Sequence, residues 1–517
     1  MKGADRRDRG DVPTTMADVV DEGVLLQLLE SRSDALALWA PGDSSGLSYG
    51  QLATVVDKLA EEFASVGVEN GDRVALALPP GPEFIELLLA ISSLGAAAAP
   101  LNPAYSEPEF SFYLEDLRPR ALLLPHGELE AARRAAHADV TVIDVTFASG
   151  GPPILSAEGG RAAEADIQPP TPDHVALLLH TSGTTSRPKQ VPLLHRNLVA
   201  SARAIARHYA LSPDDVSYCA MPLFHVHGLV ASTLAQLAGG GTVLAPRRVG
   251  PARFWSQLAD CGATWYSASP TLHQMVVERA PTSRPDTLRL RFVRSCSSAM
   301  SPELAARIEE YLDVPLLEAY GMTEASHEMA ANPLPPRKHV PGSVGVPTGA
   351  EIRIVDDQGA QVEDGFAGEV VIRGPGVMGG YLANEQANAE SFRDGWFRTG
   401  DQGRFDDGYL TLVGRIKEFI LRGGENVSPL EVEAVLLLHP ALSDAVVYGI
   451  PDPKYGQLVG AAVVPTTELS DTDVMEHCKE HLAPFKIPSV VHVVDSIPRT
   501  PTGKVQRTRM PAHFGED

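Results

Sequence analysis

A chain of 517 residues is too long for a single hydrophobic core, so the sequence predicts two or more domains. Hydrophobic residues make up 44% of the chain and charged residues 21%, which is ordinary for a globular enzyme. The formal net charge of −23 argues against a general nucleic-acid binder or a protein of anionic membranes, because a negative field repels phosphate. Any bound nucleotide must therefore be held at a local positive site.

The amino-terminal and cysteine patterns bear on location. Residues 1–9 are charged and no apolar segment follows them, so we expect no secretory signal peptide. The most apolar stretch, residues 87–101, is interrupted by serine, glycine and proline and is too short to span a bilayer. The four cysteines form no CxxC pair, which is typical of reduced thiols and predicts neither a disulfide framework nor a metal cluster. We expect a soluble, cytoplasmic protein without integral membrane association.

Alternating strand and helix patterns fill the first part of the chain. Strands are predicted at residues 73–78, 121–124, 140–145 and 175–179, with a helix at 82–94. The theme then repeats, with helices at 195–209, 227–238 and 252–260 and strands at 216–218, 242–245 and 264–267. Strands and helices of these lengths predict largely parallel sheets with helices on their faces.

After about residue 340 the pattern changes to short alternating strands between Asp and Gly turns, at 351–355, 369–372 and 409–412. From Gly414 onward, helices are predicted at 429–438 and 471–482 and strands at 443–448 and 489–494. We therefore predict an α/β fold in which a large N-terminal domain, 1–413, holds two doubly wound α/β subdomains and a β-rich subdomain. A small mobile α+β domain, 414–517, would follow, and the joint at 413–417 is expected to be functional.

A run of small hydroxyl residues separates the apolar segment at 175–179 from the helix predicted at 195. Residues 179–190 read LHTSGTTSRPKQ, which is not a Walker A sequence. Backbone N–H groups of such a loop can face phosphate oxygens, and hydroxyls and a lysine can add donors. The candidate phosphate contacts are Thr181, Ser182, Gly183, Thr184, Thr185 and Lys189. The plain alternative is a polar surface loop.

Further sequence blocks follow in a fixed order. They read EAYGMTE at 318–324, WFRTGD at 396–401, GRIKE at 414–418 with RGGEN at 422–426, and PRTPTGK at 498–504. Together with the loop at 179–190, these blocks resemble the adenylate-forming superfamily of acyl-CoA synthetases, luciferases and peptide-synthetase adenylation domains. The resemblance extends from about residue 25 to 510. The segments FHVHG at 224–228, SCSSA at 295–299 and EASH at 324–327 look most like oxalyl-CoA synthetases.

The resemblance implies an ATP-dependent acid–CoA ligase with ATP, Mg²⁺ and coenzyme A as its cofactors. A small carboxylic acid would become an acyl-AMP and then a CoA thioester, with release of pyrophosphate and AMP. Lys504 would orient the carboxylate and the α-phosphate, and His225 would lie near these reacting groups. Lys417 would be the hinge about which the small domain rotates, and Glu324 would be the magnesium carboxylate.

The same resemblance implies the nucleotide contacts. Asp401 would bind the ribose hydroxyls, Arg415 the ribose or phosphates, and Tyr320 would stack on adenine, although an aromatic residue there could equally be core. The other residues of this site would be Cys296, Ser297, Ser298, Glu318, Ala319, Gly321, Met322 and Thr323. Gly423 and Gly424 would let the pantetheine arm of CoA pass close to the backbone.

Two positions depart from the superfamily pattern. Ser186 and Gln190 stand where the phosphate loop usually has glycine. If those positions need a positive φ, both residues are strained, and Gln190 has no evident compensating contact. We expect an active enzyme with altered ATP affinity or rate, and a catalytically silent binding homologue is the alternative that these positions leave open.

The predicted acyl pocket is polar. Burying polar groups without partners costs roughly 1–3 kcal/mol each, so an apolar tail would fit badly and a small acid with a second carboxylate would fit well. We predict that His225, Ser297 and His327 bind the acid and that the acid is oxalate. The alternatives are that His227 and Ser298 point elsewhere, that the acid is a short- or medium-chain fatty acid or an aromatic acid, or that a carrier protein receives the acyl group. The oligomeric state is left open.

Overall fold

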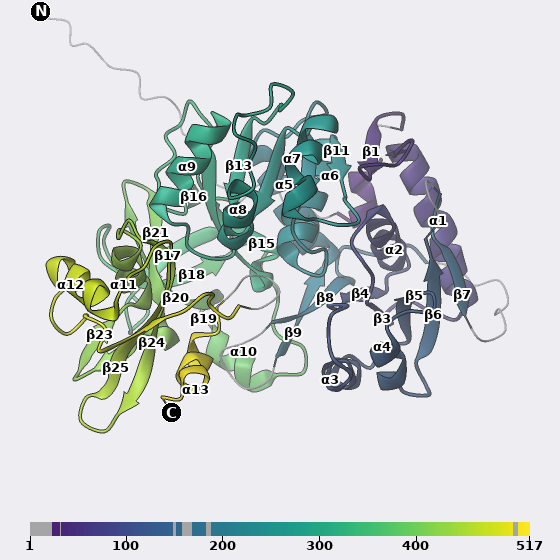
Figure 1. Ribbon diagram of the computed structural model, residues 1–517. Helices are drawn as coiled ribbons and strands as arrows, with labels where there is room; N and C mark the ends of the chain where they lie inside the picture. Colours follow the sequence, from purple (N-terminus) through teal and green to yellow (C-terminus); the bar gives the residue numbers. More distant parts are fainter. Residues whose placement is uncertain are drawn as a thin grey trace, which may run out of the picture.

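The computed structural model describes residues 23–30, 33–147, 151–157, 168–181, 188–499 and 505–516. Within these residues the strands form four sheets. Two large sheets with surrounding helices occupy the chain up to β16 (Val346–Pro347), and two smaller sheets follow (Figure 1). The predicted α/β fold class, with two doubly wound units, a β-rich unit and a carboxyl-terminal α+β unit, is confirmed.

The first large sheet has seven strands in the order β7-β6-β5-β3-β4-β8-β9. They are β3 (Arg73–Leu76), β4 (Ala97–Pro100), β5 (Ala121–Pro125), β6 (Thr141–Thr146), β7 (Ile154–Ala157), β8 (Val175–Thr181) and β9 (Lys189–Leu194). Neighbours from β6 to β8 are parallel, and the edge strands β7 and β9 are antiparallel. Parallel neighbours need crossover connections, which α2 (Pro82–Ser93), α3 (Glu107–Leu117) and α4 (Glu130–Ala135) supply.

The second large sheet has nine strands in the order β16-β15-β14-β13-β12-β10-β11-β1-β2. They are β1 (Leu36–Trp39), β2 (Leu47–Ser48), β10 (Val216–Cys219), β11 (Thr242–Leu244), β12 (Trp265–Ala268), β13 (Phe292–Ser295), β14 (Leu316–Met322), β15 (His327–Ala331) and β16. Helices α5 (His195–His208), α6 (Ala235–Gly239), α7 (Pro251–Asp260), α8 (Pro270–Val277) and α9 (Pro302–Leu312) accompany it. Strands β12, β13 and β14 are parallel, so their carboxyl ends meet at one edge of the sheet.

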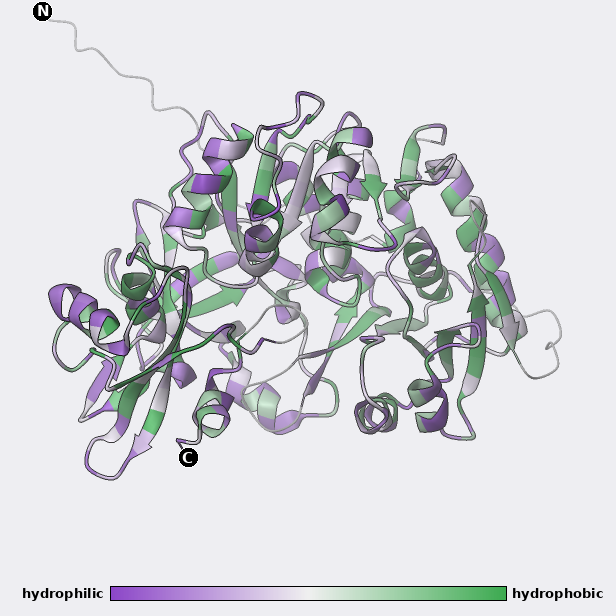
Figure 2. Ribbon diagram, in the orientation of Figure 1, coloured by the Kyte–Doolittle hydropathy of each residue, from purple (hydrophilic) through white to green (hydrophobic). Residues whose placement is uncertain are grey.

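One core joins the two large sheets. The largest buried cluster includes Leu76 of β3, Val243 of β11 and Trp265 of β12. Helix α2 is buried along its whole length and contacts α1 (Tyr49–Ser65). Figure 2 shows hydrophobic strands inside the sheets and outer helices such as α9 with hydrophilic turns toward the surface. In the described part of the chain, no helix combines the length and the hydropathy that a bilayer crossing requires.

Two smaller sheets complete the described chain. The β-rich sheet has β17 (Glu351–Val355), β18 (Gly368–Arg373), β19 (Phe392–Arg393), β20 (Trp396–Asp406) and β21 (Tyr409–Arg415), with α10 (Glu385–Ser391) beside it. The last sheet has β22 (Ile420–Arg422), β23 (Glu425–Val427), β24 (Leu442–Asp452), β25 (Gly456–Pro465) and β26 (Val490–Val493). Its helices are α11 (Pro429–Leu436), α12 (Asp471–His481) and α13 (Met510–Phe514). Both sheets lie at the same end of the molecule (Figure 1).

The 3-10 turn η5 (Ile416–Glu418) connects the two smaller sheets. Ser428, the N-cap of α11, donates its hydroxyl to the carbonyl of Val413 at 2.6 Å. Arg507 donates to both carboxylate oxygens of Glu433 at 2.8 and 2.6 Å and to Glu418 at 3.3 Å. The segment that follows position 504 is therefore tied to the joint. The predicted boundary between residues 413 and 414 falls within β21, and the division into two domains stays a prediction.

Two elements differ from the sequence prediction. The segment at 227–238 is the π-helix η3 (His227–Leu234) followed by α6, not one α-helix. Strand β9 was not predicted, because Pro192 interrupts its pattern. Proline removes a ladder donor and is tolerated at the edge of a sheet, which is where β9 lies.

Candidate active site

Three polar side chains meet where β14, β20 and β21 come together. The register of β20 and β21 places Asp401 opposite Arg415. Arg415 donates through Nε to Oδ1 of Asp401 at 2.8 Å, and the Tyr320 hydroxyl donates to Oδ2 of the same carboxylate. Burial and then the Asp401 charge raise the pKa of Tyr320 well above its usual range, so its hydroxyl stays protonated. Asp401 is thus held as an acceptor, which suits hydrogen bonds from ribose hydroxyls.

The rest of the EAYGMTE block lies beside this cluster. Residues 318–322 belong to β14, with Ala319 buried and Gly321 and Met322 half-buried, and Thr323 begins the next turn. Glu318 accepts the backbone N–H of Gly342 at 2.7 Å, and burial raises its pKa to about 7. The contacts of these residues with a nucleotide, and the stacking of Tyr320 on adenine, stay predictions.

Glu324 lies in the buried 3-10 turn η4 (Thr323–Ala325). Its Oε1 accepts the hydroxyl of Tyr381 at 2.9 Å, and the ammonium of Lys189 lies 4.6 Å from the Tyr381 ring centre. No salt bridge between described residues involves Glu324, and no group of three or more potential metal ligands occurs among them. A single carboxylate of this kind fits Mg²⁺ that also takes oxygen ligands from phosphates. The sequence did not point to Tyr381.

The strands on either side of the phosphate loop are described, but its centre is not. Thr181 ends β8 and lies opposite Lys189, the first residue of β9. The predicted contacts Ser182, Gly183, Thr184 and Thr185, together with Ser186, lie outside the described residues, as does Lys504. Their roles stay predictions.

The expectation that Gln190 lacks a compensating contact is wrong. Gln190 lies in the extended strand β9 and has no positive φ. Its side-chain amide donates to the backbone carbonyl and the carboxylate of Asp116 at 2.8 and 2.6 Å, and His180 pairs with the same carboxylate at 2.8 Å. Asp116 of α3 therefore joins the two strands that carry the loop.

Polar residues from three elements form the predicted acyl site at the carboxyl ends of β12 and β13. His227, the first residue of η3, is hydrogen-bonded through Nε2 to Ser267 at 2.6 Å and through Nδ1 to Ser297 at 2.9 Å. The His227 and His327 ring centres are 5.2 Å apart. The interpretation that His227 satisfies only backbone groups is therefore wrong. A π-helical turn at this position fits the association of such turns with functional sites.

Glycines allow this close packing. A Cβ on Gly228 would lie 2.4 Å from the carbonyl oxygens of Met221 and Pro222. A Cβ on Gly321 would lie 2.2 Å from the carbonyl oxygen of His327. Ser297 and His327 themselves have φ of 81° and 104°, so both are in strained backbone conformations of the kind that clusters at functional sites.

An ion pair that the sequence did not predict lies beneath the two histidines. Arg294 of β13 and Glu328 of β15 have side chains 0% and 1% exposed, with a distance of 2.8 Å between Nη2 and Oε2. Arg294 also donates to Ser267 at 3.0 Å, and Thr348 donates to Glu328 at 3.1 Å. The only signal in the sequence was an arginine inside the otherwise apolar start of β13.

The histidines beside this ion pair are neutral. Burial, and then the Arg294 charge, lower the pKa of both His227 and His327 well below the usual range. Each ring therefore has one donor and one acceptor nitrogen at neutral pH.

Other predicted acyl-site residues are less closely associated. The His225 ring lies 4.9 Å from that of Phe224 and is half-buried. Cys296 is buried next to Ser297, whereas Ser298 is exposed. Ser326 donates its hydroxyl to the carbonyl of Gly376 at 2.8 Å, so it satisfies backbone and not the pocket.

The candidate CoA segment is a hairpin turn. Arg422 pairs with Glu425 across β22 and β23, and Gly423 and Gly424 between them have φ of 61° and 92°. Two positive φ angles in a two-residue hairpin explain both glycines without a ligand. Both are exposed, as is Lys417 in η5. Their predicted roles in CoA passage and domain rotation stay predictions.

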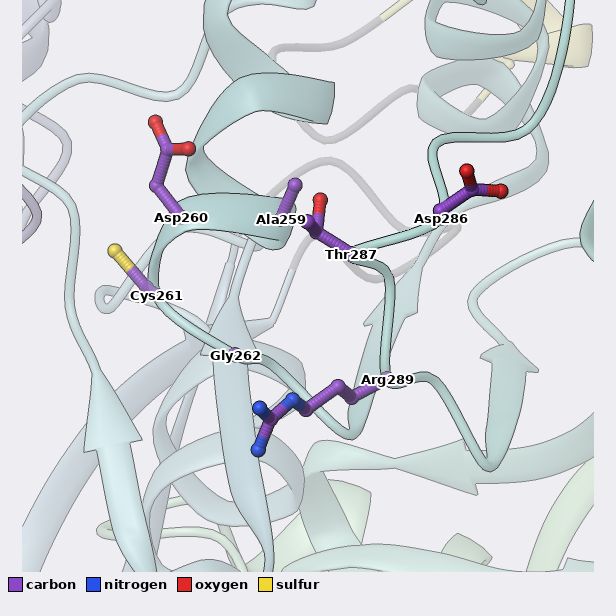
Figure 3. A pocket seen from close by; sticks show the side chains of 7 residues that line it. All are labelled: Ala259, Asp260, Cys261, Gly262, Asp286, Thr287 and Arg289. Atoms are coloured by element: carbon purple, nitrogen blue, oxygen red, sulfur yellow. The ribbon is translucent and has the colours of Figure 1, made fainter.

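A surface hollow of about 520 Å³ lies elsewhere (Figure 3). Its side chains include Asp260, Cys261, Thr287 and Arg289, from the loops that precede β12 and β13. It is therefore at the amino ends of these strands. In open α/β sheets ligands bind at the carboxyl ends, where His227 and Ser297 gather, so this hollow is separate from the candidate site.

The chain matches known enzymes along most of its length. The AMP-binding enzyme family matches residues 27–382, and the AMP-binding enzyme C-terminal domain matches residues 431–504. An oxalate–CoA ligase of Arabidopsis thaliana is 43% identical over 96% of this chain and 98% of its own. An oxalate–CoA ligase of Saccharomyces cerevisiae is 40% identical over 92% of this chain and 94% of its own.

A solved structure supports the same assignment. The ATP-bound MatB of Rhodopseudomonas palustris has a TM-score of 0.85 and 27% identity, and covers 95% of this chain and 99% of its own. The predicted resemblance to adenylate-forming enzymes is confirmed, as is the use of ATP, Mg²⁺ and CoA. The chain belongs to the AMP-binding enzyme family and is an ATP-dependent, AMP-forming acid–CoA ligase.

Proposed function

We propose that the acid activated by this ligase is oxalate. The observation that supports this best is the polar group of His227, Ser297 and His327 above the buried Arg294–Glu328 pair. An aliphatic or aromatic tail would leave these donors without partners, at roughly 1–3 kcal/mol each. The relatives named oxalate–CoA ligases, with 43% and 40% identity, support the same substrate.

The distal carboxylate of oxalate would accept hydrogen bonds in this pocket. A hydrogen bond that involves one charged partner contributes about 1.5–3 kcal/mol, which exceeds the contribution of a neutral pair. Ser297 is exposed and its hydroxyl can donate to a bound acid, and His327 lies beside His227. His225 would lie close to the reacting carboxylate.

In the first half-reaction one carboxylate oxygen of the acid attacks the α-phosphorus of ATP, and pyrophosphate leaves. We propose that Asp401 and Arg415 hold the ribose, Tyr320 contacts adenine, and Lys189 and the loop that begins at Thr181 contact the phosphates. Glu324 would hold Mg²⁺, which offsets the charge that develops on the phosphate oxygens. Lys504 would fix the carboxylate and the α-phosphate relative to each other.

In the second half-reaction the CoA thiolate attacks the acyl carbonyl, and AMP leaves. We propose that residues 414–517 rotate about Lys417 between the two half-reactions and bring Gly423 and Gly424 to the acyl-AMP. The separate family matches at 27–382 and 431–504 support two units. We also propose a cytoplasmic location, which is supported by four cysteines that are all unpaired.

A substrate panel tests this function. The protein is incubated with Mg²⁺, ATP, CoA and oxalate, malonate, acetate, butyrate or octanoate, and AMP formation is measured with and without CoA. We expect AMP, pyrophosphate and oxalyl-CoA, with the highest kcat/KM for oxalate. A preference for octanoate would contradict oxalate as the substrate, and ADP as the nucleotide product would contradict adenylation itself.

A further inference from the structure

A single buried guanidinium contacts both branches of the polar pocket. Arg294 donates through Nη1 to the Ser267 hydroxyl at 3.0 Å and through Nη2 to Nδ1 of His327 at 3.4 Å. Its Nε and Nη2 also reach Glu328 at 3.2 and 2.8 Å, and Nε lies 3.2 Å from the Tyr209 hydroxyl. A guanidinium has five N–H donors and no acceptor. Each atom in contact with it must therefore accept.

This requirement fixes the protonation of His327. Because Arg294 cannot accept, Nδ1 of His327 must be the acceptor nitrogen. The ring is neutral, so its single proton lies on Nε2. No hydrogen-bond partner for that Nε2 is present in the described part of the chain. His327 thus offers one unused N–H donor.

The same requirement passes through Ser267 to His227. The Ser267 oxygen accepts from Arg294, and its other contact among the described residues is Nε2 of His227 at 2.6 Å. The hydroxyl proton of Ser267 therefore points to Nε2, and His227 carries its proton on Nδ1. That Nδ1–H donates to Ser297 at 2.9 Å. The Ser297 hydroxyl then accepts from His227, and its own proton is directed to the pocket.

We propose that Arg294 is the specificity-determining positioning residue of this site. It sets opposite tautomers on His227 and His327, so that the network presents only donors, Ser297 O–H and His327 Nε2–H, to the acid. The Arg294 charge itself is balanced by Glu328, so the site selects an acceptor group and not simply an anion. This inference rests on the proposed function and narrows its substrate class to acids whose distal group accepts hydrogen bonds.

The tautomers can be measured without any acid. In protein labelled with ¹⁵N in the histidine rings, the nitrogen shifts and proton couplings distinguish Nδ1–H from Nε2–H. We assign the two residues by the loss of their signals in His227→Asn and His327→Asn. We expect Nδ1–H for His227 and Nε2–H for His327, and the opposite tautomer at either ring would overturn the proposal. Because no acid is present, this outcome is independent of whether oxalate is the substrate.

Variants test the effect on specificity. Arg294→Lys keeps a residue that only donates, whereas Arg294→Gln combined with Glu328→Gln supplies side-chain acceptors and leaves no buried charge unpaired. We expect the double variant to lose the fixed tautomers and to reduce the ratio of kcat/KM for oxalate to that for acetate roughly ten- to hundredfold. We expect Arg294→Lys to keep both tautomers and to restore most of that ratio.

A neighbouring arginine gives the matched control. Arg291 also pairs with a carboxylate, at 2.7 Å from Asp215, but has no contact with the pocket histidines among the described interactions. Arg291→Gln should leave the tautomers and the oxalate-to-acetate ratio unchanged. If the double variant folds but keeps both tautomers, or loses activity equally with both acids, the proposal is overturned. If it does not fold, the wild-type tautomers and Arg294→Lys still decide.

Discussion

At the scale of single residues, the candidate site depends on groups whose hydrogen-bonding role is fixed by a neighbour. Asp401 is held as an acceptor by Tyr320 and Arg415, and Glu324 by the hydroxyl of Tyr381. The pocket histidines are held in the same way by Ser267 and Arg294. Side chains fixed before a ligand binds lose less rotamer freedom on binding, which favours affinity.

The His327→Ala variant tests the acyl site. We expect the KM for oxalate to rise roughly ten- to hundredfold, because one donor to the distal carboxylate is lost at about 1.4 kcal/mol per decade. The kcat/KM for acetate and butyrate should fall less, since a monocarboxylate has no distal group to bind. Steady-state kinetics with all three acids give the comparison. His126→Ala, at an exposed histidine, is the control, and a uniform loss with the three acids would show that His327 only supports the scaffold.

At the scale of elements, the strands on either side of the phosphate loop are fixed by α3. Asp116 near the end of α3 accepts from His180 of β8 and from Gln190 of β9. Since β9 is an edge strand with a proline in its middle, these side-chain bonds add to a weakened ladder.

The Gln190→Gly variant should therefore weaken the protein instead of relieving strain. We expect a loss of roughly 1–3 kcal/mol in the free energy of unfolding, because two side-chain hydrogen bonds disappear and a strand gains a glycine. The KM for ATP should rise as well. Urea unfolding and ATP kinetics measure both effects, with a double-mutant cycle between Gln190→Ala and Asp116→Ala to isolate the coupling. A more stable glycine variant with a lower KM for ATP would support the strain interpretation.

Helix α2 contains a buried carboxyl group that makes stability depend on pH. Burial and then the charge of Glu83 raise the pKa of Glu86 to about 8, and its Oε2 has no partner among the described atoms. A raised pKa in the folded state means that the stabilising contribution is complete below the unfolded value of 4.5 and is lost as the pH rises through 8.

Glu86→Gln should remove this dependence. Between pH 4.5 and 8 the folded state keeps a proton that the unfolded state has released, so stability falls by at most about 1.4 kcal/mol per pH unit. We expect the variant to have a higher Tm than the wild type at pH 8 and a smaller difference at pH 5. Thermal unfolding of both proteins across this range measures it. A parallel pair of Tm curves would contradict the assigned pKa.

The elements also show what the sequence could and could not predict. Most strands and helices were predicted within a few residues, because apolar periodicity and glycine or proline boundaries mark them locally. Residues Asp401 and Arg415 could be paired in advance only through the resemblance. Arg294 was missed because its role depends on Glu328 and His327 from another strand, and Gln190 because its partner Asp116 is 74 residues away. Such contacts exist only after the chain has folded.

At the scale of the whole molecule, the last segment of the chain is linked to the joint between the small sheets. Arg507 pairs with Glu418 in η5 and with Glu433 in α11. This interaction ties the segment just after Lys504 to the turn that holds Lys417. Rotation of residues 414–517 would therefore carry the lysine loop with the rest of the small domain.

The Lys504→Ala variant should separate the two half-reactions. We expect pyrophosphate release from ATP and oxalate to fall roughly 10²- to 10³-fold, because one fixed donor to the developing charge is lost. Thioester formation from synthetic acyl-adenylate and CoA should stay near the wild-type rate. Each half-reaction is measured alone, and an equal loss in both would mean that the lysine supports the structure of the small domain.

The Lys417→Pro variant should have the opposite effect. Lys417 is exposed in η5, so its side chain contributes little packing, and a proline at this position restricts φ to about −65°. If the small domain must turn about this residue after adenylation, restricting its backbone should slow thioester formation more than tenfold and leave pyrophosphate release nearly unchanged. Lys417→Ala is the matched control, because it removes the same side chain and keeps the backbone free. Normal thioester formation in the proline variant would place the pivot elsewhere, whereas an equal defect in the alanine variant would show that the ammonium group, not the backbone, carries the effect.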